Sequence, residues 1–407
     1  MTSKAFVSLL HRQIWQRLPR SLRRTALFHA TSIAAPRPTP NATPAFPLIV
    51  AGPLKTASGL GQSARLSHDA LRRAGLPVLG IDLTNLLRQV EDVANFAFED
   101  GSNHQGPGTL LLNVNAPTAP LAMMQLGSKL IANKRIAACW AWELPLVPPD
   151  WSHGIPFVHE IWTPSAFTAD AISPIAQGRA VTVIPYPVAL GRTQPKRAPR
   201  TRTDPFTVLT IFNVASSFAR KNPCAAIEAF RLGLGDDPKT HLIVKLANPS
   251  SYPGSLDIVE QAVSGAANIT IIDRTFNALE IDLLYEKADA LISLHRSEGF
   301  GLTLAEAMLH GLPVVATNWS GNTDFLTPQT GIPIPYTLIP ARDPQGSYDH
   351  PEMTWADVDI PAAANALTRL RDDPAFANRL GHDAACTALD TWSPDRYVAA
   401  VRAQLGL

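Results

Sequence analysis

The chain has 407 residues, 46% hydrophobic and 17% charged, so it is long enough for two compact domains and too apolar for wholesale disorder. Its 35 basic and 34 acidic residues nearly cancel, which excludes a global positive field that would gather nucleic acid. Cys139, Cys224 and Cys386 stand far apart, in no metal-ligand or disulfide pattern, and a reducing compartment is the simpler expectation.

The N-terminal segment is basic, because no acidic residue precedes Asp69. Apolar residues between Phe6 and Leu18 recur at helical spacing, which predicts an amphipathic helix over residues 4–18. Such a helix suits an anionic membrane surface, but also packing on the protein itself, partial disorder, or an organellar transit peptide. No apolar run is long enough to span a bilayer. A proline-rich tether follows, so residues 1–45 are assigned to this segment and tether.

Residues 46–190 alternate between β-rich runs and helical patterns and form the predicted N-terminal, acceptor-side domain. The expected strands are PLIVAG, LPVLGID, TLLLNVN, RIAACWAW, HEIWTP and VTVIPYPV. A helix is expected over residues 62–74, between the first two runs. Residues 191–205 are rich in proline and arginine, which predicts an interdomain linker.

Residues 206–407 show the same alternation more regularly and form the predicted nucleotide-sugar domain. The expected strands are FTVLTIFNV, HLIVKLA, NITIID, ALISLHR and PVVATN, with helical patterns between them. Strands separated by helices predict right-handed βαβ units. The chain is therefore predicted to be α/β, with two doubly wound Rossmann-like domains facing each other across a ligand-binding cleft. Whether the last helix crosses back to the first domain is left open.

The strongest motif is SEGFGLTLAEAM, directly after the strand ALISLHR. Its glycines suit a tight strand-to-helix turn, so Glu298 is expected on the loop and Glu306 inside the following helix. The first N–H groups of that helix favour an anion such as phosphate, and a carboxylate beside them can take sugar or ribose hydroxyls. The alternative interpretation is an ordinary strand-loop-helix with two solvated glutamates.

Three cations are expected near the carboxyl ends of strands in the same domain. Arg220 and Lys221 follow the first strand, and Lys245 lies near the end of the second. Arginine and lysine both suit a diphosphate, the first as a planar fork and the second as a point charge. A solvated turn with a lysine that reaches out of the sheet would explain them equally simply.

Together these motifs resemble the retaining nucleotide-sugar glycosyltransferases of family 4, including its mannosyltransferase-like group, whose members have the two-domain GT-B fold. The resemblance covers roughly residues 46–405 and is most specific in SEGFGLTLAEAMLHGLPVVATNWSGNTDFL, with support from RKNP, IEAF, LIVK, WAWELP and EIWTPSAF. It implies that Glu298 holds hydroxyls of the transferred sugar, and that Glu306 holds the nucleotide ribose.

The resemblance also implies a donor site built from several separate segments. Its expected residues are Gly59, Gly61, Arg220, Lys221, Lys245, Asp273, Arg274, Gly299, Phe300, Gly301, Leu302 and Thr303. In this family the cations neutralise the leaving diphosphate, the residues from 299 to 303 contact sugar and diphosphate through their backbone, and the segment at 273 and 274 lies by the base. One departure stands out: many members carry an arginine where this chain has Ser216, so which cation replaces it is open.

Two other motifs suggest rival functions. GLGQSA, with Asp82 at the end of the next expected strand, fits the fingerprint of an NAD(P)-dependent oxidoreductase. However, residues 52–58 intervene between the expected strand and the first glycine. The sequence DVD at 357–359 spells a metal-binding motif of another transferase fold, but a solvated turn is the favoured interpretation.

The expected activity is therefore transfer of a hexose, with retention, from a nucleotide sugar to a glycan or lipid-linked oligosaccharide in surface or exopolysaccharide synthesis. The resemblance favours GDP-mannose as donor, with UDP-sugars next. No cofactor and no metal are expected. The protein is expected to be cytoplasmic or peripheral at the inner face of the cell membrane. A non-catalytic nucleotide-sugar-binding protein of the same fold is the remaining alternative.

The residues that would bind the acceptor are marked less clearly in the sequence. Candidates for a base are His104, Glu143, His153 and His159, or the donor phosphate itself. Trp140 and Trp142 could stack on an acceptor sugar or pack in the core.

Overall fold

The computed structural model describes residues 28–87, 91–93, 95–192 and 205–407. The amphipathic helix predicted over residues 4–18 and most of the predicted linker at 191–205 lie outside the described residues. In the described part of the chain, no helix has both the length and the apolar character needed to cross a membrane.

The first half of the chain folds around a parallel sheet of six strands with the order β2-β1-β3-β4-β5-β6. The strands are β1 (Leu48–Gly52), β2 (Val78–Asp82), β3 (Gly108–Leu112), β4 (Lys134–Cys139), β5 (Glu160–Thr163) and β6 (Ala180–Val183). The connecting helices include α3 (Gly59–Arg73), α4 (Ala119–Ile131), α5 (Ala166–Ile172) and the 3₁₀ segment η3 (Pro149–Phe157). Runs such as LIVAG are buried throughout, as expected for a parallel sheet that is covered on both faces.

The second half repeats this design, with strand order β12-β11-β10-β7-β8-β9. Its strands are β7 (Phe206–Asn213), β8 (Thr240–Ala247), β9 (Ile269–Ile272), β10 (Ala290–Ser293), β11 (Val314–Thr317) and β12 (Ile332–Ile334). An antiparallel hairpin of β13 (Tyr336–Pro340) and β14 (Thr354–Val358) follows. The helices are α6 (Phe218–Lys221), α7 (Pro223–Leu234), α8 (Ser255–Val263), α9 (Ala278–Lys287), α10 (Leu302–Leu309), α11 (Ile360–Asp372), α12 (Pro374–Thr391) and α13 (Pro394–Leu405). The predicted α/β class with two doubly wound sheets is confirmed.

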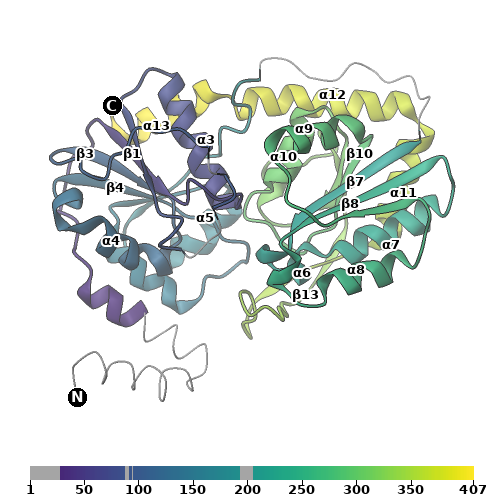
Figure 1. Ribbon diagram of the computed structural model, residues 1–407, viewed down its shortest axis with the longest axis horizontal. Helices are drawn as coiled ribbons and strands as arrows, with labels where there is room; N and C mark the ends of the chain where they lie inside the picture. The colour runs from purple at the N-terminus through teal and green to yellow at the C-terminus, as the bar shows by residue number, and fades with distance from the viewer. Residues whose placement is uncertain (1–27, 88–90, 94, 193–204) are drawn as a thin grey trace.

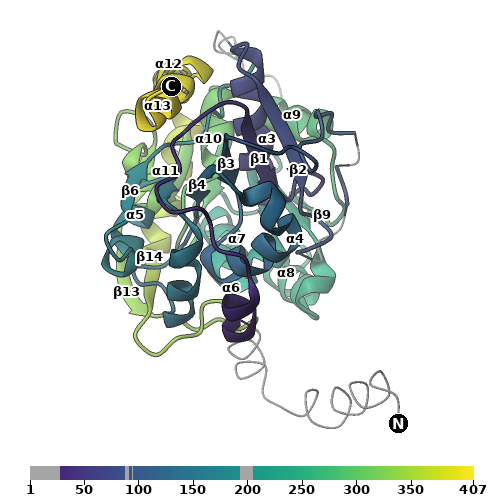
Figure 2. The same ribbon diagram turned by 90° about the vertical axis from the view of Figure 1, so that its left-hand side faces the viewer.

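The last two helices join the halves. In Figure 1, α12 runs along the second half and α13 lies beside the first, and Figure 2 shows the same arrangement from the side. Tyr397, Val401 and Leu405 of α13 are buried with Leu48 of β1 in one hydrophobic cluster, and α13 contacts α3. The domain boundaries drawn from the sequence at 46, 191 and 206 stay a prediction, while the last helix does pack on the first sheet.

Two local expectations are corrected by the structure. The helix expected over residues 62–74 starts earlier, at Gly59, because Ser58 caps it by accepting a hydrogen bond from the Gly61 amide at 3.2 Å. The DVD segment is not a solvated turn: Asp357 and Val358 lie in β14, and Asp359 caps α11 through the Ala362 amide.

Candidate functional site

Three predicted site residues of the second half meet beyond the carboxyl ends of two neighbouring strands, β7 and β10. Arg220 and Lys221 lie in α6, shortly after β7, and Glu298 lies in the loop between β10 and α10. The carboxyl ends of parallel strands share one edge of the sheet, so the βαβ repeat brings these distant segments together.

The cations and the first glutamate form a buried ionic cluster. Both Lys221 Nζ and Arg220 Nη1 contact Glu298 Oε1, the arginine at 3.2 Å. The Arg220 guanidinium also donates to the carbonyls of Ser297 at 2.6 Å and Ser216 at 2.8 Å. Arg220 is 2% exposed, so its position is set by these contacts. The backbone carbonyl of Ser216, the position at which the resemblance leads one to expect an arginine, is one of the groups that hold Arg220.

The cluster keeps Glu298 ionised. Burial alone would raise the pKa of this carboxyl, but the charges of Lys221 and Arg220 outweigh burial and lower the pKa to about 2. Burial lowers the pKa of Lys221, against the opposing charge of Glu298. The Glu298 amide donates to Ser320 Oγ at 2.7 Å, which fixes the loop that carries the carboxylate. The site therefore holds a fixed negative charge between two fixed positive ones.

Glu306 lies in α10, as predicted, and both of its carboxylate oxygens are engaged. Gln62 Nε2 of α3 donates to Oε1, and the Tyr285 hydroxyl of α9 donates to Oε2 at 2.9 Å. Burial raises the pKa of Glu306, while these two hydrogen bonds act the other way. The Gln62 contact joins the two halves of the chain. The sequence did not identify either partner: Gln62 lies within the motif GLGQSA without being singled out there, and no sequence pattern marks Tyr285.

The start of α10 lies opposite the start of α3. Gly301 caps α10 with a φ of 101°, a conformation that favours glycine, and the side chain of Leu302 lies 3.9 Å from where a Cβ of Gly59 would stand. At Gly61 a Cβ would lie 2.4 Å from the Thr56 carbonyl oxygen, so no larger residue fits. The two helix N-termini thus lie close together. That of α3 is capped by Ser58, whereas α10 has no side-chain cap and presents backbone N–H groups suited to an anion.

Phe300 and Thr303 show which parts of the motif face the site. Phe300 is 5% exposed and its ring packs against Phe325 and Trp392, so only its backbone is available to a ligand. Thr303 and Leu302 are partly exposed at the first turn of α10, while Gly299 is buried against Trp142 of the first half.

The segment predicted to meet the nucleotide base lies at the end of β9. Asp273 is exposed, and Arg274 contacts Glu280 at 2.7 Å and lies over the Phe276 ring at 4.1 Å. Lys245 of β8 lies 5.0 Å from the same ring and is 2% exposed. Burial, followed by the charge of Arg274, lowers the pKa of Lys245 to about 8. This segment is thus adjacent to Lys245.

The first half meets the Glu298 loop and the following segment at Asp324 through four hydrogen bonds. Ser165 Oγ donates to the Gly299 carbonyl at 2.5 Å, and Thr168 Oγ1 donates to the same carbonyl at 3.2 Å. Ser297 Oγ donates to the Glu143 carbonyl, and the Ala166 amide donates to Asp324 at 2.8 Å. These contacts place WAWELP and EIWTPSAF, the first-half segments that carry the resemblance, against the Glu298 loop.

Of the four candidate bases, the structure brings Glu143 to this interface. Its carboxylate accepts a hydrogen bond from Tyr348 of the second half at 2.9 Å. His159 instead lies before the amino end of β5, bonded to the Thr39 carbonyl and the Ile136 amide. His104 lies near Lys134 at the amino end of β4, and His153 packs on His29.

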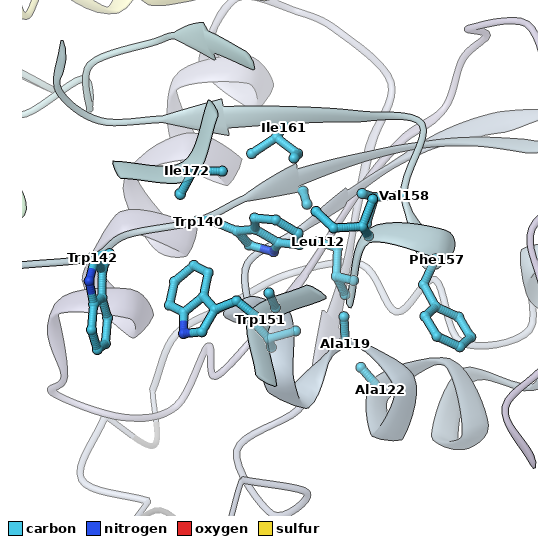
Figure 3. Close-up of a cluster of buried hydrophobic side chains, with 14 of the residues drawn as sticks. Leu112, Ala119, Ala122, Trp140, Trp142, Trp151, Phe157, Val158, Ile161 and Ile172 are labelled. Carbon is cyan, nitrogen blue, oxygen red and sulfur yellow. The ribbon is translucent and has the colours of Figure 1, made fainter. Parts of the chain in front are cut away.

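Trp140 and Trp142 belong to the core, which answers the question left open by the sequence. They are 0% and 7% exposed, and both rings contact Trp151 edge to face (Figure 3). The interpretation of Trp140 as an acceptor-stacking residue was therefore wrong. A ring that suits a sugar also suits a core, and burial decided between them.

The oxidoreductase fingerprint is not supported by its local structure. β1 ends at Gly52 and α3 begins at Gly59, so a loop separates the strand from the first glycine of GLGQSA. Asp82 at the end of β2 accepts hydrogen bonds from the amide and hydroxyl of Thr84, which caps a turn. Among the described residues, no group of three or more His, Cys, Asp or Glu side chains is arranged to hold a metal ion.

Comparisons with known proteins agree with this geometry. Residues 209–351, which contain the ionic cluster and α10, match the family described as glycosyl transferases group 1. The chain is also 26% identical over 210 residues to trehalose synthase of Rubrobacter xylanophilus. That match covers 48% of this chain and 45% of the relative, so the chain spans about half the length of this curated relative.

Solved structures match this chain in fold over most of its length. HepE from Anabaena in complex with UDP-glucose matches with a TM-score of 0.63 and 14% identity, over 88% of this chain and 99% of that one. TarM of S. aureus, in complex with Fondaparinux, alpha-GlcNAc-glycerol and UDP, has a TM-score of 0.55 and 14% identity over 74% of this chain and 55% of its own. The sucrose-phosphate synthase of Thermosynechococcus elongatus matches with a TM-score of 0.57 and 14% identity over 88% and 97%. The chain therefore has the GT-B fold of glycosyltransferases.

Proposed function

We propose that the chain is a glycosyltransferase that moves a hexose from a nucleotide sugar to a glycan or lipid-linked acceptor. The ionic cluster beside α10 carries this proposal. It places Glu298, ionised and buried, next to Arg220 and Lys221 at a helix N-terminus, within the segment that matches the group 1 glycosyl transferases.

Each part of the cluster has a role in the proposed reaction. When the bond between the sugar C1 and the diphosphate oxygen breaks, negative charge grows on the diphosphate and positive charge on the sugar ring. Lys221, Lys245 and the N-terminal turn of α10 stabilise the departing diphosphate, and the Glu298 carboxylate binds sugar hydroxyls and stabilises the positive ring. Arg220 holds Glu298, because its guanidinium is bound between protein oxygens on several sides.

Glu306 is proposed to bind the ribose. In the unliganded protein its oxygens accept from Gln62 and Tyr285. A ribose hydroxyl can replace the Gln62 amide, which is the partner contributed by the other half of the chain, while Tyr285 keeps the carboxylate in place. Asp273 and Arg274 are proposed to lie by the base, because they adjoin Lys245.

The finer parts of the activity are proposals from the resemblance. Transfer with retention and a role in surface or exopolysaccharide synthesis come from it, as does GDP-mannose as donor. UDP-glucose is the second candidate donor, since HepE was solved with UDP-glucose. Metal independence and association of the N-terminal segment with anionic membranes also stay predictions. Membrane association is tested by comparing the binding of the full chain to anionic vesicles with that of a chain lacking residues 1–36, which should bind less.

The test is turnover by the purified protein with GDP-mannose, UDP-glucose, UDP-N-acetylglucosamine and ADP-glucose. Release of nucleoside diphosphate is measured with and without chelator, and the anomeric configuration of the product is read by NMR. We expect one donor to be consumed, with retention, and Glu298→Gln to lower the rate at least about 100-fold. Binding of NADH without binding of any nucleoside diphosphate would favour the oxidoreductase instead. Tight nucleotide binding with no transfer to any acceptor would favour the non-catalytic alternative.

A further inference from the structure

The loop between β13 and β14, residues 341–353, crosses from the second half of the chain to the first. Tyr348 and Met353, 9% and 2% exposed, are buried in the same hydrophobic cluster as Trp142 and Trp151. The Tyr348 ring lies 5.3 Å from the Trp142 ring. A second-half loop therefore completes the core of the first half and contacts the segment that carries Trp142 and Glu143.

The same loop is tied to the segment that carries the cations. Asp343, 3% exposed, accepts hydrogen bonds from Ser217 Oγ at 2.9 Å and from the Tyr348 amide at 3.1 Å. Gln345 accepts from the Phe218 amide at 2.6 Å. Ser217 and Phe218 share the short helix region of Arg220 and Lys221, with only Ala219 between the two pairs, so the loop and the cations keep one relative position.

The Tyr348 side chain connects both sides of the site. Its hydroxyl donates to Glu143 Oε2 at 2.9 Å, and the Arg220 guanidinium lies over its ring at 5.3 Å. Burial raises the pKa of Tyr348, so the hydroxyl stays protonated and remains a donor at neutral pH. The result is a continuous path of contacts from Glu143 through Tyr348 and Arg220 to Glu298.

We propose that Tyr348 is a positioning residue for the acceptor side of the reaction and that it acts through Glu143. Its hydrogen bond holds one carboxylate oxygen, so that the other oxygen, Oε1, is aimed at the acceptor hydroxyl that attacks the sugar. In that step the hydroxyl oxygen bonds to the sugar C1 and the C1–diphosphate bond breaks. The hydroxyl proton passes to Glu143 or to the departing phosphate. The inference rests on the proposed glycosyltransferase function and adds to it the residue that orients the first-half carboxylate.

The test compares Tyr348→Phe, Glu143→Gln and the double variant in the full-length protein. The assay is transfer from the donor that turns over in the panel above, to octyl glucoside, octyl mannoside or water, whichever wild type uses. Calorimetry gives the affinity for the matching nucleoside diphosphate. The phenylalanine keeps the ring on Trp142 and Arg220 and removes only the hydroxyl. Tyr397→Phe, which removes another buried tyrosine hydroxyl bonded to Ser67 in the first half, is the matched control.

We expect each single variant to lower kcat about tenfold or more, with nucleoside diphosphate affinity within about twofold of wild type. The double variant should turn over as slowly as Glu143→Gln alone, because the hydroxyl acts only through that carboxylate. Tyr397→Phe should leave kcat unchanged. An unchanged kcat in Tyr348→Phe, or a double variant whose loss is the product of the single losses, would overturn this inference. Wild-type inactivity with every donor would instead overturn the proposed function.

Discussion

The two halves of the molecule have the same six-stranded parallel sheet but bury different chemistry beyond the carboxyl ends of their strands. After β4, the first half buries Trp140, which packs with Trp151; these are 0% and 1% exposed. After β7 and β10, the second half buries Arg220 and Glu298, which are 2% and 7% exposed. Although the two sheets differ in strand order, the segments that follow their strands thus bury rings in one half and charges in the other.

The difference separates what stabilises the fold from what the site requires. Burial of an indole ring stabilises the folded chain by itself, through lost apolar surface and ring contacts. Burial of an ion pair often gives no net stabilisation, because desolvation of both charges offsets their attraction. The tryptophans are therefore explained by folding, whereas the charges of the second half need a further explanation, and the donor binding proposed above provides one.

The largest effect is expected from a substitution in the tryptophan cluster of the first half. Trp151→Ala should lower the free energy of unfolding by about 3–5 kcal/mol, because the cavity lies between the rings of Trp140 and Trp142. Denaturant unfolding gives this value, and calorimetry under native conditions should show nucleoside diphosphate affinity within about twofold of wild type. If the variant lost nucleoside diphosphate affinity while its free energy of unfolding stayed unchanged, the tryptophans would instead belong to the ligand site.

The ionic side is tested by two buried carboxylates, one from each half. Glu160 in β5 contacts Arg135 at 2.8 Å and accepts from Trp162 and Gln404, each at 3.0 Å. Glu160→Gln should reduce stability and leave kcat/KM unchanged. Glu298→Gln should lower kcat/KM about 100- to 1000-fold, because a fixed charge at the reacting sugar is lost. If both variants lost the same factor in kcat/KM, the loss in Glu298→Gln would be due to impaired folding and not to a change at the candidate site.

How much of this could be predicted from the sequence depends on the range of the interactions. Apolar runs predicted all six strands of the first sheet and five of the six in the second; β12, only three residues long and containing a proline, was missed. The glycine-flanked motif placed Glu298 on a loop and Glu306 in a helix. These features could be predicted because they are local. Tyr348 and Gln62 contact residues far away in the chain, and no short pattern marks such partners. The start of α3 was misplaced because the glycines after Ser58 indicated a loop, although Ser58 is itself a capping residue.

A smaller effect should appear in the pH dependence of nucleotide binding. Lys245 has its pKa lowered to about 8 by burial and by Arg274, and it must be protonated to pair with a diphosphate. Affinity should therefore be constant below about pH 8 and fall by up to about tenfold per pH unit above it. Calorimetric titrations between pH 7 and 9.5 measure this dependence and locate the pH at which affinity begins to fall to within about half a pH unit. The Lys245→Met variant should bind the nucleotide more weakly at neutral pH, and its affinity should no longer fall above about pH 8. If the affinity of the variant falls in the same way as that of wild type, another group is responsible for the pH dependence.

The smallest expected effect concerns the contact between the halves. Ser165→Ala removes the hydrogen bond to the Gly299 carbonyl, while Thr168 Oγ1 still reaches that carbonyl at 3.2 Å. We expect a loss of about 1 kcal/mol in the free energy of unfolding and about a twofold change in donor KM. Thermal unfolding and steady-state kinetics check both values. A loss of activity as large as that of Glu298→Gln would mean that Ser165 itself contacts substrate.

The central claim, that the charges of the second half are kept for a nucleotide-sugar diphosphate, is tested most directly by titration calorimetry. Wild type and Lys221→Met are titrated with UDP, GDP and ADP. We expect wild type to bind one of these nucleotides and the variant, whose folding is checked by its thermal midpoint, to bind it at least about tenfold more weakly. No binding of any of them, or equal affinity in both proteins, would contradict it.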